Sequence, residues 1–535
     1  MNRFSLQDFQ GGDDLTRFRR AADALRAHPG STLVIPPGDY LLRDPEAAEL
    51  QRAVMYGEYG ACPQNRLFTA SMEYVVGIDF SSCRDVTVEG SGARLFFDGF
   101  LEPILLRETV NFTLRGIILD TVRRPFSSAW VESCGGGKMI LNFGEQPLIN
   151  ARMPMLRAVI TDGNGRWIRA RQSLPRDLKL TELGGGRIQL ENDEWEGSEG
   201  GRFFVSHSYH FRPAIHLWEA VNSKLEEVTI HSHHGMGVVA FHSTDITLRR
   251  CAVIPAPGEG ISTNTDATHF ASCRGALLIE QCAFRNHGDD AANVHNYYHT
   301  VTAVDGNQCT LEMRAPTGTH SQKEDLFAPG DTLELTSPEN LARLEEFKVV
   351  RHVSTGVNRG SLILDRPLPE HACGKLLCDI DLLPRFTFRD NVVAEHFGRG
   401  VLVKCRHVRI CNNTFSGVLG TAVQIAGEAY WAEGAGCEDV RISRNRIWDC
   451  GRVACSPCGI MKDTGGIVVN VSAKDPHAAV HRDVAIEDNV VDCPRTEHAI
   501  YAGNTVGMTV DRNQMRSKGN PLLVCDCQQP EGMMK

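Results

Sequence analysis

The sequence lacks several features that mark whole classes of protein. Only 7% of its 535 residues are aromatic, and its lysines and arginines form no basic run, so a nucleic-acid partner is not expected. No apolar run is long enough to span a membrane. The first residues, Met1 to Phe4, lack the apolar core of a signal peptide. We therefore expect a cytoplasmic protein without a membrane partner, or a secreted or periplasmic one if a leader has been removed.

Complete metal motifs are also missing, although the chain has 18 cysteines. Cys455 and Cys458 are closely spaced, as are Cys525 and Cys527, but no second pair completes a zinc site. Most of the other cysteines stand singly in strand-like segments, which is typical of buried thiols. His231, His233 and His234 alternate between two faces of a strand and have no accompanying carboxylate. The sequence thus predicts no metal and no cofactor.

Short alternating strands recur through most of the chain. Neighbouring copies are about 20–32 residues apart, a spacing that indicates a solenoid. Because the repeated element is a strand, we predict an all-β fold, a right-handed parallel β-helix. The later copies end in asparagine, which can satisfy backbone groups at the corners of the coil. The copies include Asp85–Gly90, Val110–Gly116, Ser223–Ile230, Ser243–Leu248, His407–Asn413, Asp439–Asn445 and Asp483–Asn489.

An amphipathic segment precedes the first repeat. Asp13 or Asp14 can cap a helix over Leu15–His28, and the strand at Ser31–Ile35 is followed by Pro-Pro-Gly. This order resembles the N-terminal cap of the pectate-lyase-like β-helix superfamily. A cap has a physical purpose, since an open coil end exposes apolar cross-section and strand edges.

Two stretches interrupt the repeats and predict inserted β-barrel-like modules. We divide the chain into the cap and first coils (1–133), a first inserted module (134–211), central coils (212–300), a second module (301–383), and C-terminal coils with a tail (384–535). The second module begins just after an acidic cluster, so we expect it to overhang the site there.

Three aspartates form the strongest chemical signal. Asp266 and the pair Asp289–Asp290 are separated by one strand unit, Arg274–Phe284, so adjacent coils would bring all three together. Crowded carboxylates raise one another's pKa, and a glycosidase needs one carboxylic acid and one carboxylate. Isolated aspartates in such a chain are commonly turn residues, but this spacing favours an inverting glycoside hydrolase.

The short sequence motifs around these aspartates resemble those of known families. Asn264-Thr265-Asp266 followed by Asp289-Asp290 is similar to the catalytic pattern of polygalacturonases, which are inverting β-helix hydrolases. Longer words resemble glycoside hydrolase family 110, the α-1,3-galactosidases: Thr265–Phe270, Asp289–His295, His234–Val238, Arg399–Leu402 and Trp431–Gly434. The resemblance implies an exo-acting inverting enzyme on a galactose-terminated oligosaccharide or glycan. It implies catalysis by Asp266, Asp289 and Asp290, and the polygalacturonase analogy makes Asp289 the acid.

Other residues are predicted to contact the substrate. His269, His295 and Asn293 lie near the carboxylates in sequence, and Trp431 with Glu433 offers an aromatic face beside a carboxylate, which suits galactose. The remaining candidates are His234, Arg212 and Arg399. Each also has a structural interpretation: a hydrogen-bonded core histidine, a packed tryptophan or an ordinary salt bridge.

Two other functions remain open. The first is a polygalacturonase-like hydrolase of another polysaccharide, although the Arg-Ile-Lys word that binds uronates is absent, since Gly400 follows Arg399. The second is a carbohydrate-binding solenoid without turnover, which would not need three clustered carboxylates. A homo-oligomer is possible.

Overall fold

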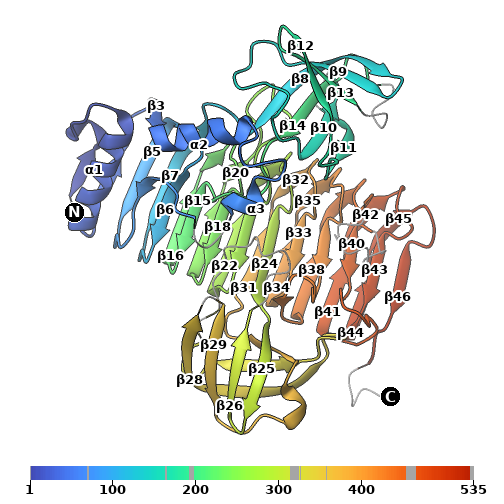
Figure 1. Cartoon of the computed structure of the whole chain (residues 1–535). Helices are drawn as coiled ribbons and strands as arrows, with labels where there is room; N and C mark the ends of the chain where they lie inside the picture. The colour runs from blue at the N-terminus through green and yellow to red at the C-terminus, as the bar shows by residue number, and fades with distance from the viewer. Residues whose placement is uncertain are drawn as a thin grey trace.

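The computed structural model describes residues 2–68, 72–162, 166–191, 198–313, 325, 327–356, 358–453 and 465–529. Cys455 and Cys458 lie outside these residues. The described chain winds into a long parallel β-helix, with the N-terminus at one end and the C-terminal coils at the other (Figure 1). The predicted β-helix is confirmed.

Three ribbons of parallel strands form the coil, and we call them the first, second and third ribbons. The first ribbon consists of β4 (Val76–Asp79), β6 (Glu102–Arg107), β15 (Ile215–Trp218), β18 (Val238–Phe241), β21 (Thr268–Ala271), β24 (Ala292–Tyr297), β33 (Val401–Val403), β36 (Val423–Ile425), β40 (Ile467–Val469), β43 (Ile500–Gly503) and β46 (Leu522–Cys525), with the short antiparallel β37 (Glu433–Gly434) beside β24.

The second and third ribbons form one 21-stranded sheet, because β5 (Thr87–Asp98) and β7 (Thr113–Thr121) run through both. The other strands of the second ribbon are β1 (Arg3–Ser5), β2 (Thr32–Val34), β16 (Val221–Glu226), β19 (Thr244–Arg249), β22 (Arg274–Glu280), β31 (Arg385–Arg389), β34 (Arg406–Cys411), β38 (Glu438–Ser443), β41 (His481–Glu487) and β44 (Thr505–Asp511). Those of the third are β3 (Gly38–Arg43), β17 (Thr229–Ile230), β20 (Ala252–Val253), β23 (Ala283–Arg285), β32 (Val392–Ala394), β35 (Thr414–Ser416), β39 (Arg446–Trp448), β42 (Val490–Cys493) and β45 (Gln514–Ser517).

One apolar core runs through the middle of the coils. Alternate residues of each strand point inward and stack on the same position of the next coil, as Phe270 and Val294 do. An asparagine ladder runs along one corner, as the sequence predicts. The side-chain oxygens accept the backbone N–H of the asparagine one coil earlier, and the ladder begins at Asn391 and has as its acceptors Asn413, Asn445, Asn489 and Asn513.

The N-terminal cap is the predicted helix, α1 (Asp14–Ala27). Asp13 caps it by accepting the backbone N–H of Thr16 at 2.7 Å. Leu15, Phe18 and Leu25 bury its apolar face against the first coils. Two further helices, α2 (Pro45–Met55) and α3 (Gln64–Leu67), follow, with 3₁₀ turns at Leu6–Asp8 and Glu370–Ala372. None of the described helices has the length and apolar character needed to cross a membrane.

Two antiparallel modules leave opposite edges of the coil (Figure 1). The first is a seven-stranded sheet of β8 (Phe126–Gly135), β9 (Lys138–Asn142), β10 (Arg157–Thr161), β11 (Trp167–Arg171), β12 (Leu180–Gly184), β13 (Arg187–Glu191) and β14 (Arg202–Ser206). The second is a closed barrel of β25 (His299–Asp305), β26 (Gln308–Glu312), β27 (Thr332–Thr336), β28 (Arg343–Gly356), β29 (Arg359–Leu364) and β30 (Leu376–Asp379).

The first module begins earlier than the sequence suggests. Its strand β8 starts at Phe126, before the boundary at residue 134, because β8 pairs antiparallel with β9 and β14 rather than continuing the coil. The alternation of apolar residues is the same in parallel and antiparallel strands. The pattern therefore does not show where the pairing direction changes.

Candidate active site

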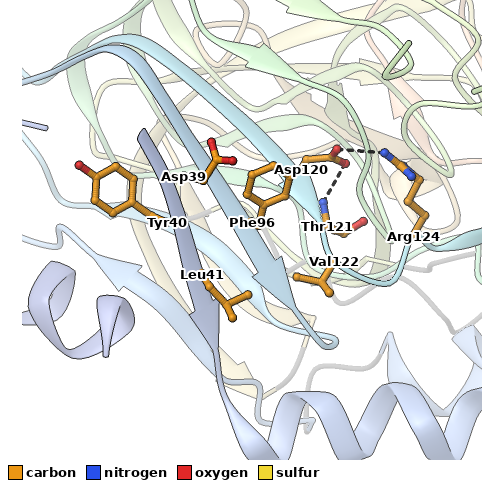
Figure 2. A pocket seen from close by; sticks show the side chains of 8 residues that line it. All are labelled: Asp39, Tyr40, Leu41, Phe96, Asp120, Thr121, Val122 and Arg124. Atoms are coloured by element: carbon orange, nitrogen blue, oxygen red, sulfur yellow. Dashed lines mark hydrogen bonds and ion pairs between the residues drawn. The ribbon is translucent and has the colours of Figure 1, made fainter. Parts of the chain in front are cut away.

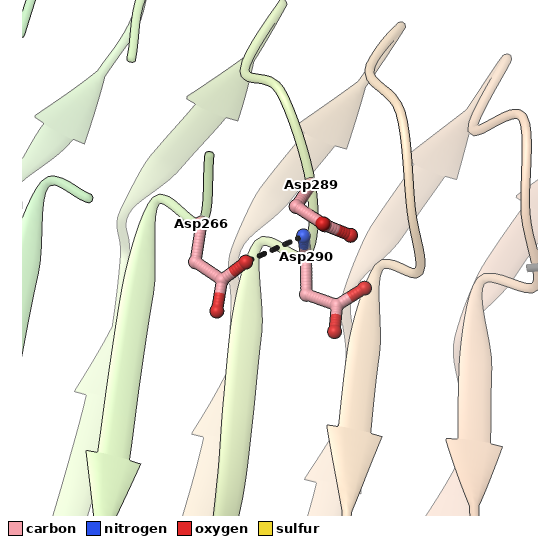
Figure 3. A group of neighbouring side chains, drawn as sticks. All are labelled: Asp266, Asp289 and Asp290. Atoms are coloured by element: carbon pink, nitrogen blue, oxygen red, sulfur yellow. Dashed lines mark hydrogen bonds between the residues drawn. The ribbon is translucent and has the colours of Figure 1, made fainter. Parts of the chain in front are cut away.

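The carboxylates gather where the third ribbon turns into the first. Asp266 precedes β21, Asp290 precedes β24 and Arg399 precedes β33, each by two residues. Parallel pairing of these strands sets the three side chains in one column on consecutive coils. One oxygen each of Asp266, Asp289 and Asp290 lies within 4.8 Å of the others, and Figure 3 shows the three at the starts of neighbouring strands. The predicted gathering of the two acidic clusters is confirmed.

Asp290 is bound by Arg399 through three hydrogen bonds. The Arg399 backbone N–H and Nε donate to Oδ1 at 2.6 and 2.8 Å, and Nη2 donates to Oδ2 at 2.7 Å. Both side chains are buried, with exposed fractions of 2% and 9%. Burial opposes the charge on Arg399, but Asp290 and Glu428 raise its pKa well above the usual value. The guanidinium of Arg399 therefore pairs with carboxylates of the protein itself, and we do not assign it to an anionic substrate.

Asp266 has a different set of partners. Its Oδ2 lies 2.7 Å from Nδ1 of His269, and its Oδ1 accepts the backbone N–H of Asp290 at 3.3 Å. Burial raises the pKa of Asp266, while His269 acts in the opposite direction. Asp266 and Asp290 thus form two buried carboxylates that share a backbone link.

Asp289 is the most exposed of the three, at 27%. Burial, then the charges of Asp290 and Asp266, raise its pKa to about 8. Gly398 makes room for it: a Cβ atom there would lie 2.5 Å from Asp289 Oδ1, and the residue has a φ of +71°. The cluster therefore combines one carboxyl group that holds its proton at neutral pH, Asp289, with two others that have hydrogen-bond partners in His269, Arg399 and the backbone.

The first inserted module reaches this acid. Arg157 of β10 donates to the backbone oxygen of Asn264, and its Nη2 lies 3.9 Å from Asp289 Oδ2. The second module leaves from the far ends of the first-ribbon strands, after β24. The expectation that the second module overhangs the acidic cluster stays a prediction. Among the described residues, Arg157 of the first module makes side-chain contact, and this module emerges from the same turn of the coil as the carboxylates.

We expect activity to fall as pH rises through about 8, because an acid with a raised pKa works only while protonated. Arg157 lowers the pKa of Asp289, so Arg157→Gln should move this basic limb to higher pH. The pH–rate profiles of the two proteins test this. A limb that stays in place, or moves to lower pH, contradicts the pairing of Arg157 with the acid.

The predicted substrate contacts fall into two groups. His269, Asn293 and His295 lie on β21 and β24, next to the carboxylates. His295 Nε2 lies 2.8 Å from His269 Nε2. Asn293 accepts a hydrogen bond from Lys404 at 3.3 Å. Glu433, only 8% exposed, belongs to the same group.

The other predicted contacts have different surroundings. His234 is 1% exposed and its ring centroid lies 3.9 Å from that of Phe100, so it packs among aromatic rings. Arg212 lies over the ring of Tyr74 at 4.7 Å, three coils before the acidic pair. Trp431 meets Tyr430 edge to face, 5.1 Å between centroids, and its contact with a sugar stays a prediction.

Sequence reasoning missed Arg157, Lys404 and Glu428. Lys404 directly follows the buried strand β33 and is fully buried, and a charge at such a position was a usable signal. Glu428 ion-pairs with both Lys404 and Arg399, at 2.7 and 3.4 Å. Arg157 and Glu428 lie far from the carboxylates in sequence, and nothing in their local pattern marks them.

The three carboxylates are close enough for one metal ion, but Arg399 already neutralises both oxygens of Asp290. We therefore expect activity to survive dialysis against a strong chelator. Loss of activity that one divalent ion restores would contradict this expectation.

A separate hollow of about 340 Å³ lies on the outer face of the third ribbon, near the cap (Figure 2). It contains two carboxylates, but both already accept hydrogen bonds from neighbouring groups. Asp39 pairs with Arg94 through two hydrogen bonds of 2.6 Å, and Asp120 accepts from Thr121 and Arg124. The acid–carboxylate combination found around Asp289 is not repeated in this hollow.

The chain is similar in sequence to one group of known proteins. No protein-family model matches the chain. It is 24% identical to α-1,3-galactosidase A of Shewanella woodyi, covering 97% of this chain and 88% of the relative. It is also 24% identical to α-1,3-galactosidase B of Bacteroides thetaiotaomicron, covering 93% and 82%. These matches span nearly the whole length of both partners. The chain is thus similar to proteins named α-1,3-galactosidase.

The similarity to these galactosidases extends through the coils and the inserted modules alike, as the coverage shows. Among solved structures it is similar to the A-module of the mannuronan C-5 epimerase AlgE4 of Azotobacter vinelandii, with 13% identity, 97% of each chain covered and a TM-score of 0.41.

Proposed function

We propose that this protein is a glycoside hydrolase that removes terminal α-1,3-linked galactose from an oligosaccharide or glycan by exo action with inversion. The observation that carries the proposal is the clustering of Asp266, Asp289 and Asp290 within 4.8 Å of one another, in which burial and the neighbouring charges raise the pKa of Asp289 to about 8. The homologues, which are named α-1,3-galactosidases, support the choice of sugar and linkage.

Asp289 is the general acid. Its raised pKa keeps a proton at neutral pH, and its exposure lets it meet the glycosidic oxygen. The proton passes to that oxygen as the bond to the sugar carbon breaks, and the transition state carries positive charge on the sugar ring. The adjacent carboxylates, Asp266 and Asp290, stabilise that charge.

Asp266 and Asp290 activate the attacking water. A proton of the water passes to one of these carboxylates, and the water oxygen bonds to the sugar carbon. Both oxygens of Asp290 already accept hydrogen bonds from Arg399, which favours a role as a fixed charge over a role as a nucleophile. Asp266 is therefore the base in this proposal.

The carboxylate spacing does not by itself support inversion. An inverting site typically has about 6.5–9.5 Å between its carboxyl groups and a retaining site about 5–5.5 Å, and we expected the former. The nearest oxygens here lie within 4.8 Å, because the side chains start from adjacent coils about 4.8 Å apart and point to one spot. The proposal of inversion rests on the third carboxylate and the engaged oxygens of Asp290.

A screen of the purified protein against α- and β-linked galactosides and polygalacturonate tests the substrate. We expect hydrolysis of terminal α-1,3-galactose, with β-galactose as the first product in proton NMR before mutarotation. Release of α-galactose first would mean that Asp266 is a nucleophile. Cleavage of polygalacturonate instead would favour the polygalacturonase-like alternative, and binding without turnover would favour the non-catalytic solenoid.

A further inference from the structure

The buried Lys404 lies in the middle of a chain of contacts that leads to Asp266 on one side and to Asp290 on the other. Lys404 Nζ lies 2.7 Å from Glu428 Oε2 and 2.5 Å from Glu433 Oε2. Through Glu428 the contacts continue to Arg399 and Asp290. Through Glu433 they continue to His295 and His269, which contacts Asp266. Asp266 and Asp290 are thus the two ends of one chain of buried charged and polar groups.

The hydrogens on the two histidines follow from their acceptors. His295 Nδ1 lies 3.0 Å from the backbone oxygen of Asn296, which can only accept, so this nitrogen carries a hydrogen. His269 Nδ1 lies 2.7 Å from Asp266 Oδ2, and with Asp266 as the carboxylate that the proposed function requires, this nitrogen donates a hydrogen. The 2.8 Å contact between the two Nε2 atoms requires one hydrogen. Three hydrogens on four ring nitrogens give the pair one positive charge.

The surroundings of the two rings decide which one is charged. His269 contacts the carboxyl group of Asp266 directly. The side chain of His295 is fully buried, and its Nε2 lies 3.7 Å from Glu433 Oε1. Burial lowers the pKa of His295 to about 3. Burial also opposes the charge on His269, but Asp266, and then Glu433, overcome it and raise its pKa, against a smaller opposite effect of Lys404. The positive charge therefore belongs on His269.

We propose that His269 works as an imidazolium and that Glu433 is the positioning residue that keeps it charged. The imidazolium holds Asp266 ionised and oriented to take a proton from water. This role rests on the proposed function, which supplies the ionised state of Asp266. Glu433, expected from the sequence to contact the sugar, then acts through the histidine pair.

The reason for assigning this role to Glu433 is its place beside Lys404. Glu433 offers one oxygen to Lys404 and turns the other toward His295. In Glu433→Gln, the positive charge of Lys404 would face the rings with one counter-charge fewer. Glu433 raises the pKa of His269, so in this variant His269 should lose its second proton at lower pH.

Neutron diffraction from crystals soaked in D₂O at neutral pH tests the proposal. In the wild type, deuterium is expected on both Nδ1 and Nε2 of His269, but only on Nδ1 of His295. A single deuterium on His269 in the wild type overturns the proposal, even if no variant folds. The measurement needs no substrate, so it is decided separately from the proposed function.

Two variants distinguish a specific role of Glu433 from the general effect of losing one buried negative charge. Glu428→Gln is the matched control, because it removes the same charge from the same lysine on the side away from the histidines. Glu433→Gln should lose one deuterium from His269, and Glu428→Gln should keep both. In the pH–rate profile of Glu433→Gln, the fall in activity on the basic side should also occur at lower pH than in the wild type. An equal fall in activity at every pH, with both deuterium atoms retained, would show that Glu433 is only structural.

Discussion

Asp289→Asn is expected to reduce turnover by about 10²–10⁴-fold, the usual contribution of a positioned acid, while the fold persists. The amide has nearly the same shape but cannot deliver a proton to the leaving oxygen. It also removes one of three crowded carboxylates, so the melting temperature should stay the same or rise. Asp290→Asn should likewise reduce turnover by orders of magnitude, because it removes the charge that Arg399 holds in place.

Asp483→Asn is a suitable control for these two variants. Asp483 lies in β41 on the second ribbon, with a side chain 61% exposed and paired to Arg441. Its φ of 49° is one that asparagine adopts readily. Normal turnover in this variant is expected. Near-normal turnover in both Asp289→Asn and Asp290→Asn, at unchanged melting temperature, would remove the carboxylates from the mechanism.

Arg399→Met is expected to lower both stability and turnover. The change leaves Asp290 and Glu428, exposed by 2% and 3%, without their shared cation. Removing one partner of a buried ion pair typically costs about 3–5 kcal/mol in the free energy of unfolding. Arg399→Lys keeps the charge but cannot donate from a planar fork to both oxygens of Asp290, so we expect an intermediate loss of stability.

Arg441→Met measures the same loss at the surface. Arg441 donates to both oxygens of Asp483 at 2.9 and 3.1 Å, but its side chain is 36% exposed. Exposed pairs contribute only about 0–1 kcal/mol. Thermal and denaturant unfolding of the three variants should therefore rank Arg399→Met as the least stable. An equal effect at Arg399 and Arg441 would contradict the buried charge network.

Much of the architecture was predictable because it is local and repeated. The alternation of apolar residues repeats from coil to coil, and this identifies strands without knowledge of their neighbours. The helix at α1 was visible for the same reason, since Asp13 and the spacing of Leu15, Phe18 and Leu25 lie within a few turns. The helix α2 was overlooked, although Asp44 caps it and Pro45 begins it.

The sequence by itself determined the β-helix and the meeting of Asp266 with Asp289 and Asp290. A repeat of nearly one coil places equal positions side by side, so spacing along the chain becomes proximity in space. Tertiary structure alone decided that Arg157 approaches Asp289 from an inserted sheet, and that Lys404, Glu428 and Glu433 connect Asp266 with Asp290. Those residues come from separate loops and a module outside the repeat. Their pairing depends on how these segments fold back over the coil, and no periodic pattern records it.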